Sequence, residues 1–431
     1  MRILLVADGR SPITRCWIKA VLSLGHSVIL ISTFPCESVE GVEADVCLPV
    51  AFSGLARSGS TSNQASGPSS FARQAISSFR SIFLAGRYVL GPLTLNYYGP
   101  RFRWLAEKIQ PDMIHALRIP FEGMLAAWAP KNIPLAVSIW GNDLTLHANG
   151  SAQMARLTRQ VLARADALVA DAGRDIRLGS AWGFSPEKPT RVVPGNGGLD
   201  LDEISHTQEA AKTSATLAEF GIQPGSTLVI NPRGFRTGSV RQDTFFAALP
   251  LIYERLAQSG NGESVTFACA AMAGQREALQ LVERNHLEGK VILLPHLPQR
   301  KLWDLFANAA ITISVSQHDG TPNSLLEAMA LGAMPVAGDI ESLREWITPG
   351  VNGLLVEPDK PQALAEAVLL ALENPELRSK AAEYNARLVR ARASAQVVRE
   401  EIQSLYTGLV KTPAEDGKTL TPPSFSPQNR I

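Results

Sequence analysis

The sequence has few cysteines, no long apolar run and almost no net charge, and each shortage excludes a class of protein. Four of its 431 residues are cysteines, and none is paired at metal-ligand spacing. No stretch approaches the roughly eighteen apolar residues of a membrane-spanning helix, and the apolar run after Met1 is too short for a secretion signal. The formal net charge of +1 gives no indication of a nucleic-acid partner. We therefore expect a cytoplasmic protein in a reducing compartment.

One segment contains no acidic residue. Between Asp45 and Glu107 there are six arginines and neither an aspartate nor a glutamate. Apolar residues such as Phe79 and Phe83 are interleaved with the first of these arginines, as in helices that lie on an anionic membrane. An ordinary amphipathic helix packed on a sheet accounts for the same pattern. For the Arg57–Arg103 segment both interpretations stay open, and one of them predicts peripheral attachment to the inner face of a membrane.

Short β-type runs alternate with helical patterns in two successive blocks, which predicts an α/β protein with two Rossmann-like parallel sheets. In the first block the expected strands are 3–7, 27–31, 112–115, 135–139, 167–170 and 191–193. In the second block they are 227–230, 265–269, 291–294, 311–315, 334–337 and 353–356. The expected domains are 1–205 and 226–410, joined by a linker over 206–225 and followed by a disordered tail over 411–431.

The most informative loop follows the expected strand 311–315, because open parallel sheets bind ligands beyond the carboxyl ends of their strands. Thr321 is suited to cap a helix there, and Pro322 is suited to be the first helical residue. The N–H groups of Asn323 and Ser324, at the positive end of that helix, then offer an anion site.

Two carboxylates flank the start of this helix. Asp319 lies before the cap and Glu327 more than a turn inside the helix, so both are able to face one ligand. Carboxylates suit the paired hydroxyls of a ribose or hexose because they accept two hydrogen bonds. Gly320 allows the backbone to approach a ligand closely. The alternative is that Asp319 caps the helix and Glu327 pairs with a surface arginine.

The region from Asp319 to Val356 resembles the signature of glycosyltransferase family 4, also called group 1, whose members are retaining enzymes of the GT-B fold. That family has an acidic residue, seven residues, and a glutamate that begins Glu-Ala-Met-Ala-x-Gly-x-x-Pro-Val. Residues Glu327–Val336 match this run, and Gly350–Val356 match a later one. The resemblance implies two domains facing a cleft, with C-terminal helices. It also implies that Glu327 binds the donor ribose, while Asp319 and the amides after it hold the donor hexose. The first acid is usually glutamate, so the aspartate leaves the identity of the sugar open.

The same resemblance implies contacts with the donor diphosphate and the base. Arg233 matches the family arginine that neutralises the diphosphate, and Arg241 is the candidate for its lysine partner, because fixed cations stabilise a leaving diphosphate. Arg236 is interpreted as a solvated loop residue. His296 and Leu297 match the loop that holds the nucleotide base.

Further candidates lie in the first domain. Gly9, in the turn after the first strand, either lets a donor phosphate or acceptor pass closely or simply forms a tight turn. Asp143 matches an acidic family position and is the candidate for orienting, or accepting a proton from, the acceptor hydroxyl. His115 and His147 are acceptor-side candidates, with a buried, hydrogen-bonded histidine as the alternative for both.

The resemblance implies retaining transfer of a hexosyl group from a UDP- or GDP-linked sugar to a glycan or lipid-linked acceptor, in cell-surface polysaccharide or glycolipid synthesis. The donor phosphate takes the acceptor proton, so no protein nucleophile is needed. We expect no cofactor and no metal, because no further ligand is spaced to join His318 and Asp319. The alternatives are a GT-B nucleotide-sugar epimerase, which needs a carboxylate pair in the first domain, and a non-catalytic sugar-nucleotide-binding partner subunit, which the intact Arg233 and Glu327 disfavour.

Overall fold

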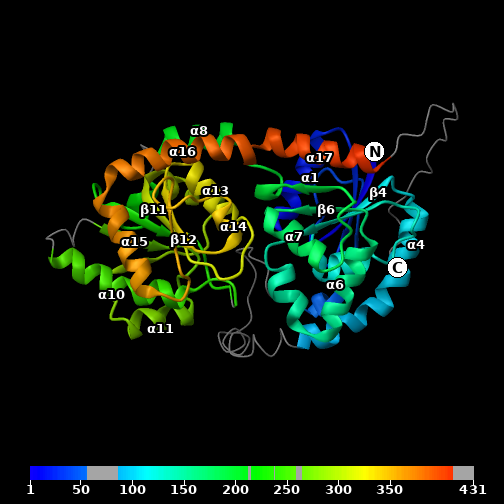
Figure 1. The fold of residues 1–431 in the computed structure, drawn as a ribbon, viewed down its shortest axis with the longest axis horizontal. Helices are drawn as coiled ribbons and strands as arrows, with labels where there is room; N and C mark the ends of the chain where they lie inside the picture. The colour runs from blue at the N-terminus through cyan, green and yellow to red at the C-terminus, as the bar shows by residue number, and fades with distance from the viewer. Residues whose placement is uncertain (56–85, 212–214, 237, 259–264, 411–431) are drawn as a thin grey trace. The chain divides into compact units, whose positions relative to one another are not determined.

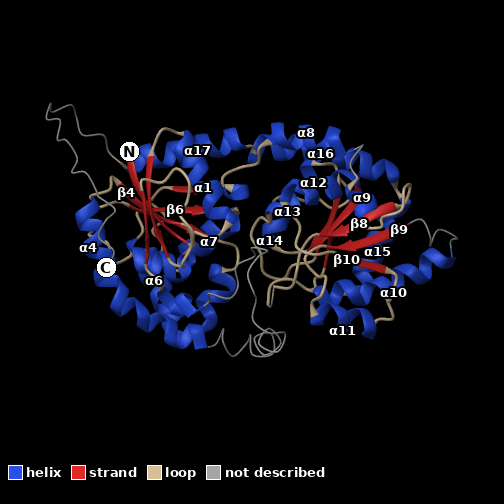
Figure 2. Cartoon of the chain, turned by 180° about the vertical axis from the view of Figure 1, so that it is seen from behind, coloured by secondary structure: helices blue, strands red, loops and turns tan. Residues whose placement is uncertain are grey.

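The computed structural model describes residues 1–55, 86–211, 215–236, 238–258 and 265–410, which divide into two compact units (Figure 1). The first unit comprises Met1–Ala170, Ile176–Val192 and the chain from Arg399 onward, and the second comprises Asp171–Asp175 and Val193–Val398. Each unit contains one parallel β-sheet with helices on both of its faces (Figure 2). The predicted α/β class with two Rossmann-like domains is confirmed.

The sheet of the first unit has seven strands in the order β3-β2-β1-β4-β5-β6-β7, and all neighbouring strands are parallel. The strands are β1 (Arg2–Ala7), β2 (Ser27–Ser32), β3 (Ala44–Cys47), β4 (Met113–Ala116), β5 (Leu135–Ile139), β6 (Ala167–Ala170) and β7 (Thr190–Val192). Its helices are α1 (Pro12–Ser23), α4 (Thr94–Ile109), α5 (Met124–Ala126), α6 (Ala152–Arg164), most of α7 (Gly173–Ala181) and most of α17 (Ala395–Leu409). The central strands are continuous buried apolar runs, as expected of a sheet covered on both faces.

The sheet of the second unit has six parallel strands in the order β10-β9-β8-β11-β12-β13. The strands are β8 (Thr227–Asn231), β9 (Val265–Cys269), β10 (Val291–Leu293), β11 (Ala309–Ser314), β12 (Met334–Gly338) and β13 (Leu354–Val356). Its helices are α8 (Leu201–Ala211), α9 (Thr216–Glu219), α10 (Gln242–Gln258), α11 (Arg276–Arg284), α12 (Gln299–Asn308), α13 (Asn323–Ala330), α14 (Glu341–Arg344), α15 (Pro361–Glu373) and α16 (Pro375–Ala393).

Successive residues of a strand feed opposite faces of this second sheet. Leu228 and Ile230 of β8 pack in one hydrophobic cluster with α12 and α13, whereas Val229 packs in another with α10 and α15. This is the period-two alternation of a β-strand. The two clusters fix the sheet between its helical layers and hold the loops at its carboxyl edge in place.

The boundary between the units differs from the expected linker over 206–225. The chain leaves the first unit after Val192, and α8 packs against α12 in the second unit. Helix α17 returns to the first unit, where Tyr406 is fully buried. The Tyr406 hydroxyl accepts a hydrogen bond from Trp17 Nε1 (3.1 Å) and bonds to His115 Nδ1 (2.7 Å). The C-terminal helix is therefore part of the first core.

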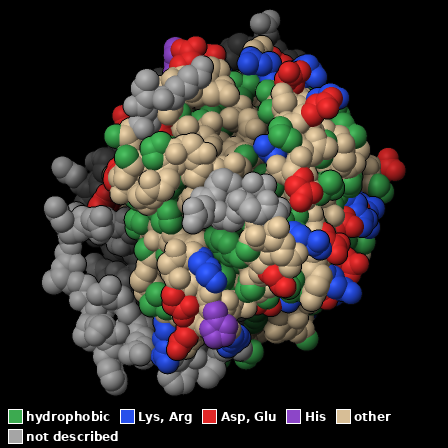
Figure 3. Space-filling model, turned by 90° about the vertical axis from the view of Figure 1, so that its left-hand side faces the viewer, with side chains coloured by type: hydrophobic (Ala, Val, Ile, Leu, Met, Phe, Trp, Pro, Cys, Tyr) green, Lys and Arg blue, Asp and Glu red, His purple; other side chains and the backbone are tan. Residues whose placement is uncertain are grey.

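Some expectations fall outside the described residues, namely the tail over 411–431 and the part of the Arg57–Arg103 segment before residue 86. Among the helices that are described, none is both long and apolar enough to cross a membrane. On the face shown in Figure 3, acidic and basic side chains are interspersed rather than separated by sign.

Candidate functional site

The loop between β11 and α13 carries the residues that the sequence singled out. Helix α13 begins at Asn323, and Pro322 occupies the N-cap position with extended backbone. The predicted cap by Thr321 is therefore wrong, because the Thr321 side chain has other partners. Its hydroxyl donates to the carbonyl of Asp171 (2.6 Å) and accepts from Trp346 Nε1 (3.0 Å). Thr321 is buried and anchors the loop rather than the helix.

Gly320 leaves no space for a side chain. A Cβ atom at this position would lie 2.3 Å from the carboxylate oxygens of Asp171. The next residue, Thr321, donates its N–H to the same carboxylate (3.2 Å). Burial raises the pKa of Asp171 well above its usual range, and the charge of Asp175 adds to this shift. The close approach that requires glycine is therefore made to Asp171.

Asp319 and Arg233 form an ion pair at this edge of the sheet. Arg233 Nη1 lies 2.8 Å from Asp319 Oδ2, and both side chains are largely buried, at 6% and 18% exposed. The Ser316 hydroxyl donates to the same oxygen of Asp319 (3.0 Å). Arg233 Nε is buried and has no hydrogen-bond partner among the described residues. Two residues expected to bind neighbouring parts of one ligand are therefore adjacent.

The second cation of this region is Arg236 rather than Arg241. Repulsion by the guanidinium of Arg233 is the main cause that lowers the pKa of Arg236. Arg241 instead donates to Asp243 through Nη2 (2.8 Å), and the charges that act on it are those of Asp243 and Asp359. Arg236 is exposed, as expected of a solvated loop residue, but the charges of Arg233 and Asp319 also act on it.

Glu327 lies on α13 and is only 6% exposed. Its Oε1 accepts a hydrogen bond from Gln299 Nε2 at the start of α12 (2.9 Å), and burial raises the pKa of Glu327. No cation pairs with it in the described part of the chain, so the alternative of a surface arginine partner does not hold. A buried carboxylate with a neutral amide partner keeps capacity to accept hydrogen bonds from ligand hydroxyls.

The loop after β10 leads directly to Gln299. His296 in this loop is exposed, while Leu297 is buried in the core of the second unit. The carbonyl of Pro295 accepts a hydrogen bond from the N–H of Ala271 (3.1 Å), which fixes the loop against the neighbouring strand end. His296 is thus in a position to contact a ligand, and Leu297 shapes the loop from beneath.

Asp143, in the first unit, is fully buried, and both of its carboxylate oxygens accept hydrogen bonds. Arg118 Nη2 donates to its Oδ1 (2.7 Å), and the N–H groups of Ile119 and Trp140 donate to its Oδ2 (3.1 and 3.2 Å). This geometry argues against proton transfer from an acceptor to Asp143. Asp143 instead holds the guanidinium of Arg118 in position beyond the end of β4.

The two acceptor-side histidines are both hydrogen-bonded. His115 is fully buried, both of its ring nitrogens have partners in Tyr406 and Ser138, and burial lowers its pKa to about 3. His147 is half-buried, and its Nδ1 bonds to the hydroxyl of Tyr88 (2.6 Å). Burial lowers the pKa of His147 to about 4, so its imidazole is neutral at pH 7. His115 is built into the core, whereas His147 borders a small cavity.

The packing around Gly9 leaves no room for a side chain at this position. A Cβ atom here would lie 2.5 Å from Cys36 Sγ and 3.1 Å from Ser32 Oγ, and the Gly9 N–H donates to that serine oxygen (3.1 Å). The tight turn is thus held by the neighbouring strand end.

Sequence reasoning missed Arg118 and Glu122. Both lie just after β4, at the carboxyl edge where ligands bind in parallel sheets. The available signal was their charge in a loop that directly follows a buried strand.

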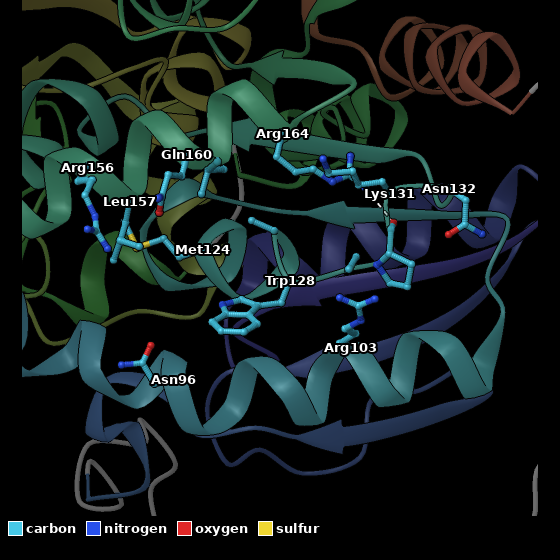
Figure 4. A pocket seen from close by; sticks show the side chains of 14 residues that line it. Asn96, Arg103, Met124, Trp128, Lys131, Asn132, Arg156, Leu157, Gln160 and Arg164 are labelled. Carbon is cyan, nitrogen blue, oxygen red and sulfur yellow. Dashed lines mark hydrogen bonds between the residues drawn. The ribbon is translucent and has the colours of Figure 1, made fainter.

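A groove of about 1140 Å³ lies between α4 and α6 in the first unit (Figure 4). Trp128 lies between side chains from α4 and α6 in this view. The described residues that line it include four cations and no carboxylate: Arg103, Lys131, Arg156 and Arg164. Lys131 and Arg164 come shortly before β5 and β6, so the groove lies toward the amino ends of these strands. It is therefore separate from the edge that carries Asp143 and Arg118.

Comparison with known proteins identifies the family. Residues 14–196 match the family described as glycosyl transferase 4-like domain, and residues 268–388 match glycosyl transferases group 1. A segment of 99 residues is 32% identical to O-antigen chain mannosyltransferase B of Escherichia coli and covers 23% of this chain and 26% of that protein. A segment of 94 residues is 33% identical to GDP-mannose:cellobiosyl-diphosphopolyprenol alpha-mannosyltransferase of Xanthomonas campestris, with 22% and 24% covered. The matched segments thus span about a quarter of these relatives.

The fold is similar to that of Anabaena HepE, solved in complex with UDP-glucose, with a TM-score of 0.66, 18% sequence identity, and 95% of this chain and all of that chain covered. Fold and comparisons together define a glycosyltransferase of the GT-B fold. The chain belongs to the group 1 glycosyltransferases, the family that the Asp319–Val356 region resembles.

Proposed function

We propose that this chain transfers a hexosyl group, with retention of anomeric configuration, from a UDP- or GDP-linked sugar to a glycan or lipid-linked acceptor in cell-surface polysaccharide or glycolipid synthesis. The observation that carries the proposal is Glu327, a buried carboxylate without a cation partner among the described residues, on the helix that follows the Arg233–Asp319 pair. HepE, whose structure was solved in complex with UDP-glucose, and the two mannosyltransferases support the choice of donor and reaction.

In this proposal each side chain binds one part of the donor. Glu327 accepts hydrogen bonds from the ribose hydroxyls, and Asp319 accepts them from the hexose. Arg233 and Arg236 stabilise the diphosphate, whose charge increases as the glycosidic bond breaks. The first turn of α13 adds its positive dipole end. The donor phosphate takes the acceptor proton, and the reaction proceeds without metal, cofactor or protein nucleophile.

The test is an assay of transfer and hydrolysis with a panel of UDP- and GDP-hexoses, with and without EDTA. The proposal expects turnover of one donor, no effect of EDTA, and loss of turnover when Asp319 and Glu327 are both replaced by alanine. The matched control is Glu376→Ala, which removes an exposed carboxylate on α16 that pairs only with Lys380 among its described neighbours. Full activity of the double variant would show that Asp319 and Glu327 do not form the donor site.

We also propose that the described end of the acid-free segment contacts an anionic membrane. Large apolar side chains are exposed at helical spacing on one stripe: Leu90, Leu93, Tyr97 and Trp104. The cations of Arg101 and Lys108 complete the stripe, 4.2 Å from the ring centroid of Tyr97 and 5.0 Å from that of Trp104. Aromatic rings beside basic groups favour the headgroup region of a bilayer.

A further inference from the structure

Two arginines border a small cavity at the carboxyl edge of the first sheet, where the proposed function places no part of the donor. Arg118 follows β4, and Arg87 lies in helical residues that precede α4. The cavity has a volume of about 30 Å³ and is also lined by Tyr88, Pro120, Phe121 and His147. That volume holds a water molecule or one oxygen atom of a bound anion.

Arg118 is fixed in place but keeps donors available. Its Nη2 is bound to Asp143, and its guanidinium carbon lies 5.0 Å from the ring centroid of Trp140. The Arg118 side chain is still 25% exposed. Its Nε is buried and has no hydrogen-bond partner within the described residues. Asp143 thus orients the guanidinium and leaves part of its planar set of N–H groups for a ligand.

Arg87 has no carboxylate partner in the part of the chain that the structure describes. Its guanidinium carbon lies 4.8 Å from the ring centroid of Phe121 and 5.6 Å from that of Phe34. Its Nε is buried and lacks a hydrogen-bond partner there, and burial lowers the pKa of Arg87. A cation held between aromatic rings without an anion is costly, so the free protein carries an unbalanced positive charge at this point.

The other polar groups around the cavity do not cancel this charge. His147 is neutral at pH 7 and bonded to Tyr88. Glu122 is turned toward the hydroxyl of Thr33 (2.9 Å), and burial raises its pKa to about 7, so it is only partly ionised at neutral pH. Asp143 forms its ion pair with Arg118, and Asp8, whose charge also acts on Arg87, forms its ion pair with Arg10. The surroundings of the cavity are therefore net positive.

We propose that a phosphate group of the acceptor binds at this cavity, with one of its oxygen atoms inside the cavity and with Arg87 and Arg118 as the donors. Guanidinium groups suit phosphate because each presents several N–H donors in a fixed plane. The inference rests on the proposed function, since it names the substrate class of the acceptor. The phosphate belongs either to a soluble sugar phosphate or to a lipid-linked sugar diphosphate, which share this chemistry.

The experiment uses the full chain with its donor site saturated by UDP or GDP, whichever binds. Inorganic phosphate is titrated into the parent protein and into Arg87→Gln, Arg87→Lys and Arg159→Gln. Arg159 is the matched control, because it is exposed on α6 with its guanidinium carbon 4.8 Å from the Trp182 ring centroid. We expect Arg87→Gln to weaken phosphate binding roughly tenfold to a hundredfold, the loss of a charged hydrogen bond. Arg87→Lys should lose less, and Arg159→Gln should match the parent.

Transfer assays then separate the two sources of phosphate. A hexose 6-phosphate, the free hexose and a polyprenyl-diphosphate-linked hexose are compared as acceptors, and the phosphate-bearing acceptor that is used should lose affinity in Arg87→Gln while the donor KM is unchanged. Unaltered phosphate binding in Arg87→Gln, equal use of free and phosphorylated acceptors, or a change in donor KM alone would each overturn the inference. Failure of the proposed function has a different signature, namely phosphate binding that depends on Arg87 in a protein that binds neither UDP nor GDP. Retained nucleoside diphosphate binding in Arg87→Gln excludes misfolding as the cause of a loss.

Discussion

Arg233 Nη1 lies 2.8 Å from Asp319 Oδ2. The two residues meet because they follow β8 and β11, which are neighbouring strands of the second sheet. The pairing joins a cation assigned to the donor diphosphate and a carboxylate assigned to the donor hexose. The phosphates of a bound sugar nucleotide would compete with Asp319 for Arg233. Binding of the ligand should therefore break the ion pair and leave each side chain to contact its own part of the donor.

The first prediction concerns this competition. Asp319→Asn should weaken binding of the intact sugar nucleotide roughly tenfold or more, because a hydrogen bond from a hexose hydroxyl to a charged group is lost. Binding of the nucleoside diphosphate without sugar should stay the same or improve, because Arg233 loses its internal partner. Titration of the variant with both ligands measures the two effects, and an equal loss for both would refute the separate roles.

Glu327 provides a second test that uses the ligand as the control. Glu327→Gln should weaken binding of the nucleoside diphosphate roughly tenfold, through weaker hydrogen bonds to the ribose hydroxyls. The same substitution should have little effect on binding of the 2′,3′-dideoxy nucleotide, which lacks those hydroxyls. A similar loss with both nucleotides would show that Glu327 acts on the fold of the loop and not on the ribose.

Glu122 predicts how stability depends on pH. Burial raises its pKa from 4.5 to about 7 against the opposing charges of Arg118 and Arg87. Between these values the folded state keeps a proton that the unfolded state releases, so the free energy of unfolding falls as pH rises through this window. The effect is about 3 kcal/mol at most.

Glu122→Gln should remove this dependence, so the variant should gain stability relative to the parent at pH 8 but not at pH 4.5. Urea unfolding at the two pH values measures the difference. An identical pH dependence in parent and variant would contradict the assignment.

Tyr406 predicts how strongly the C-terminal helix is bound to the first core. Tyr406→Phe leaves Trp17 Nε1 and His115 Nδ1 without their shared partner in the interior, which should cost about 1–3 kcal/mol of unfolding free energy. The control is Tyr384→Phe, because Tyr384 is 40% exposed on α16. Equal stability of the two variants in urea unfolding would mean that the buried hydroxyl contributes nothing.

The exposed stripe on α4 predicts lipid-dependent binding. Vesicles that contain phosphatidylglycerol should sediment the parent protein, whereas pure phosphatidylcholine vesicles should not, and salt should reduce the bound fraction. Replacing Tyr97 and Trp104 by serine should reduce it further, while Tyr384→Ser should leave it unchanged. Binding that is indifferent to anionic lipid and to salt would refute the membrane contact.

Much of the fold was predictable because buried strands of a parallel sheet are short apolar runs. All six expected strands of the second unit and all six of the first are present, with ends shifted by a residue or two. Strand β3 was missed because its four residues alternate between half-buried and exposed at the edge of the sheet. The polar segment expected as a linker contains α8 because that helix packs on α12, and composition does not reveal such a contact.

The candidate site was predictable loop by loop but not as an arrangement. The motif that begins at Glu327 identified the family, yet the pairing of Arg233 with Asp319 depends on the strand order, which the sequence does not specify. Thr321 was expected to cap α13 because threonine is favoured at that position. Its hydroxyl instead forms hydrogen bonds with Asp171 and Trp346. The ion pair of Asp143 was not predicted for a similar reason, since Arg118 was not considered as its partner.

The most direct test of the central claim is a crystal structure of the protein with its preferred nucleoside diphosphate sugar. We predict that the ribose hydroxyls lie within hydrogen-bond distance of the Glu327 carboxylate, that the diphosphate contacts Arg233, and that contacts to the ligand replace the Arg233–Asp319 ion pair. A nucleotide bound elsewhere on the chain, or bound without a contact to the Glu327 carboxylate, would contradict this assignment.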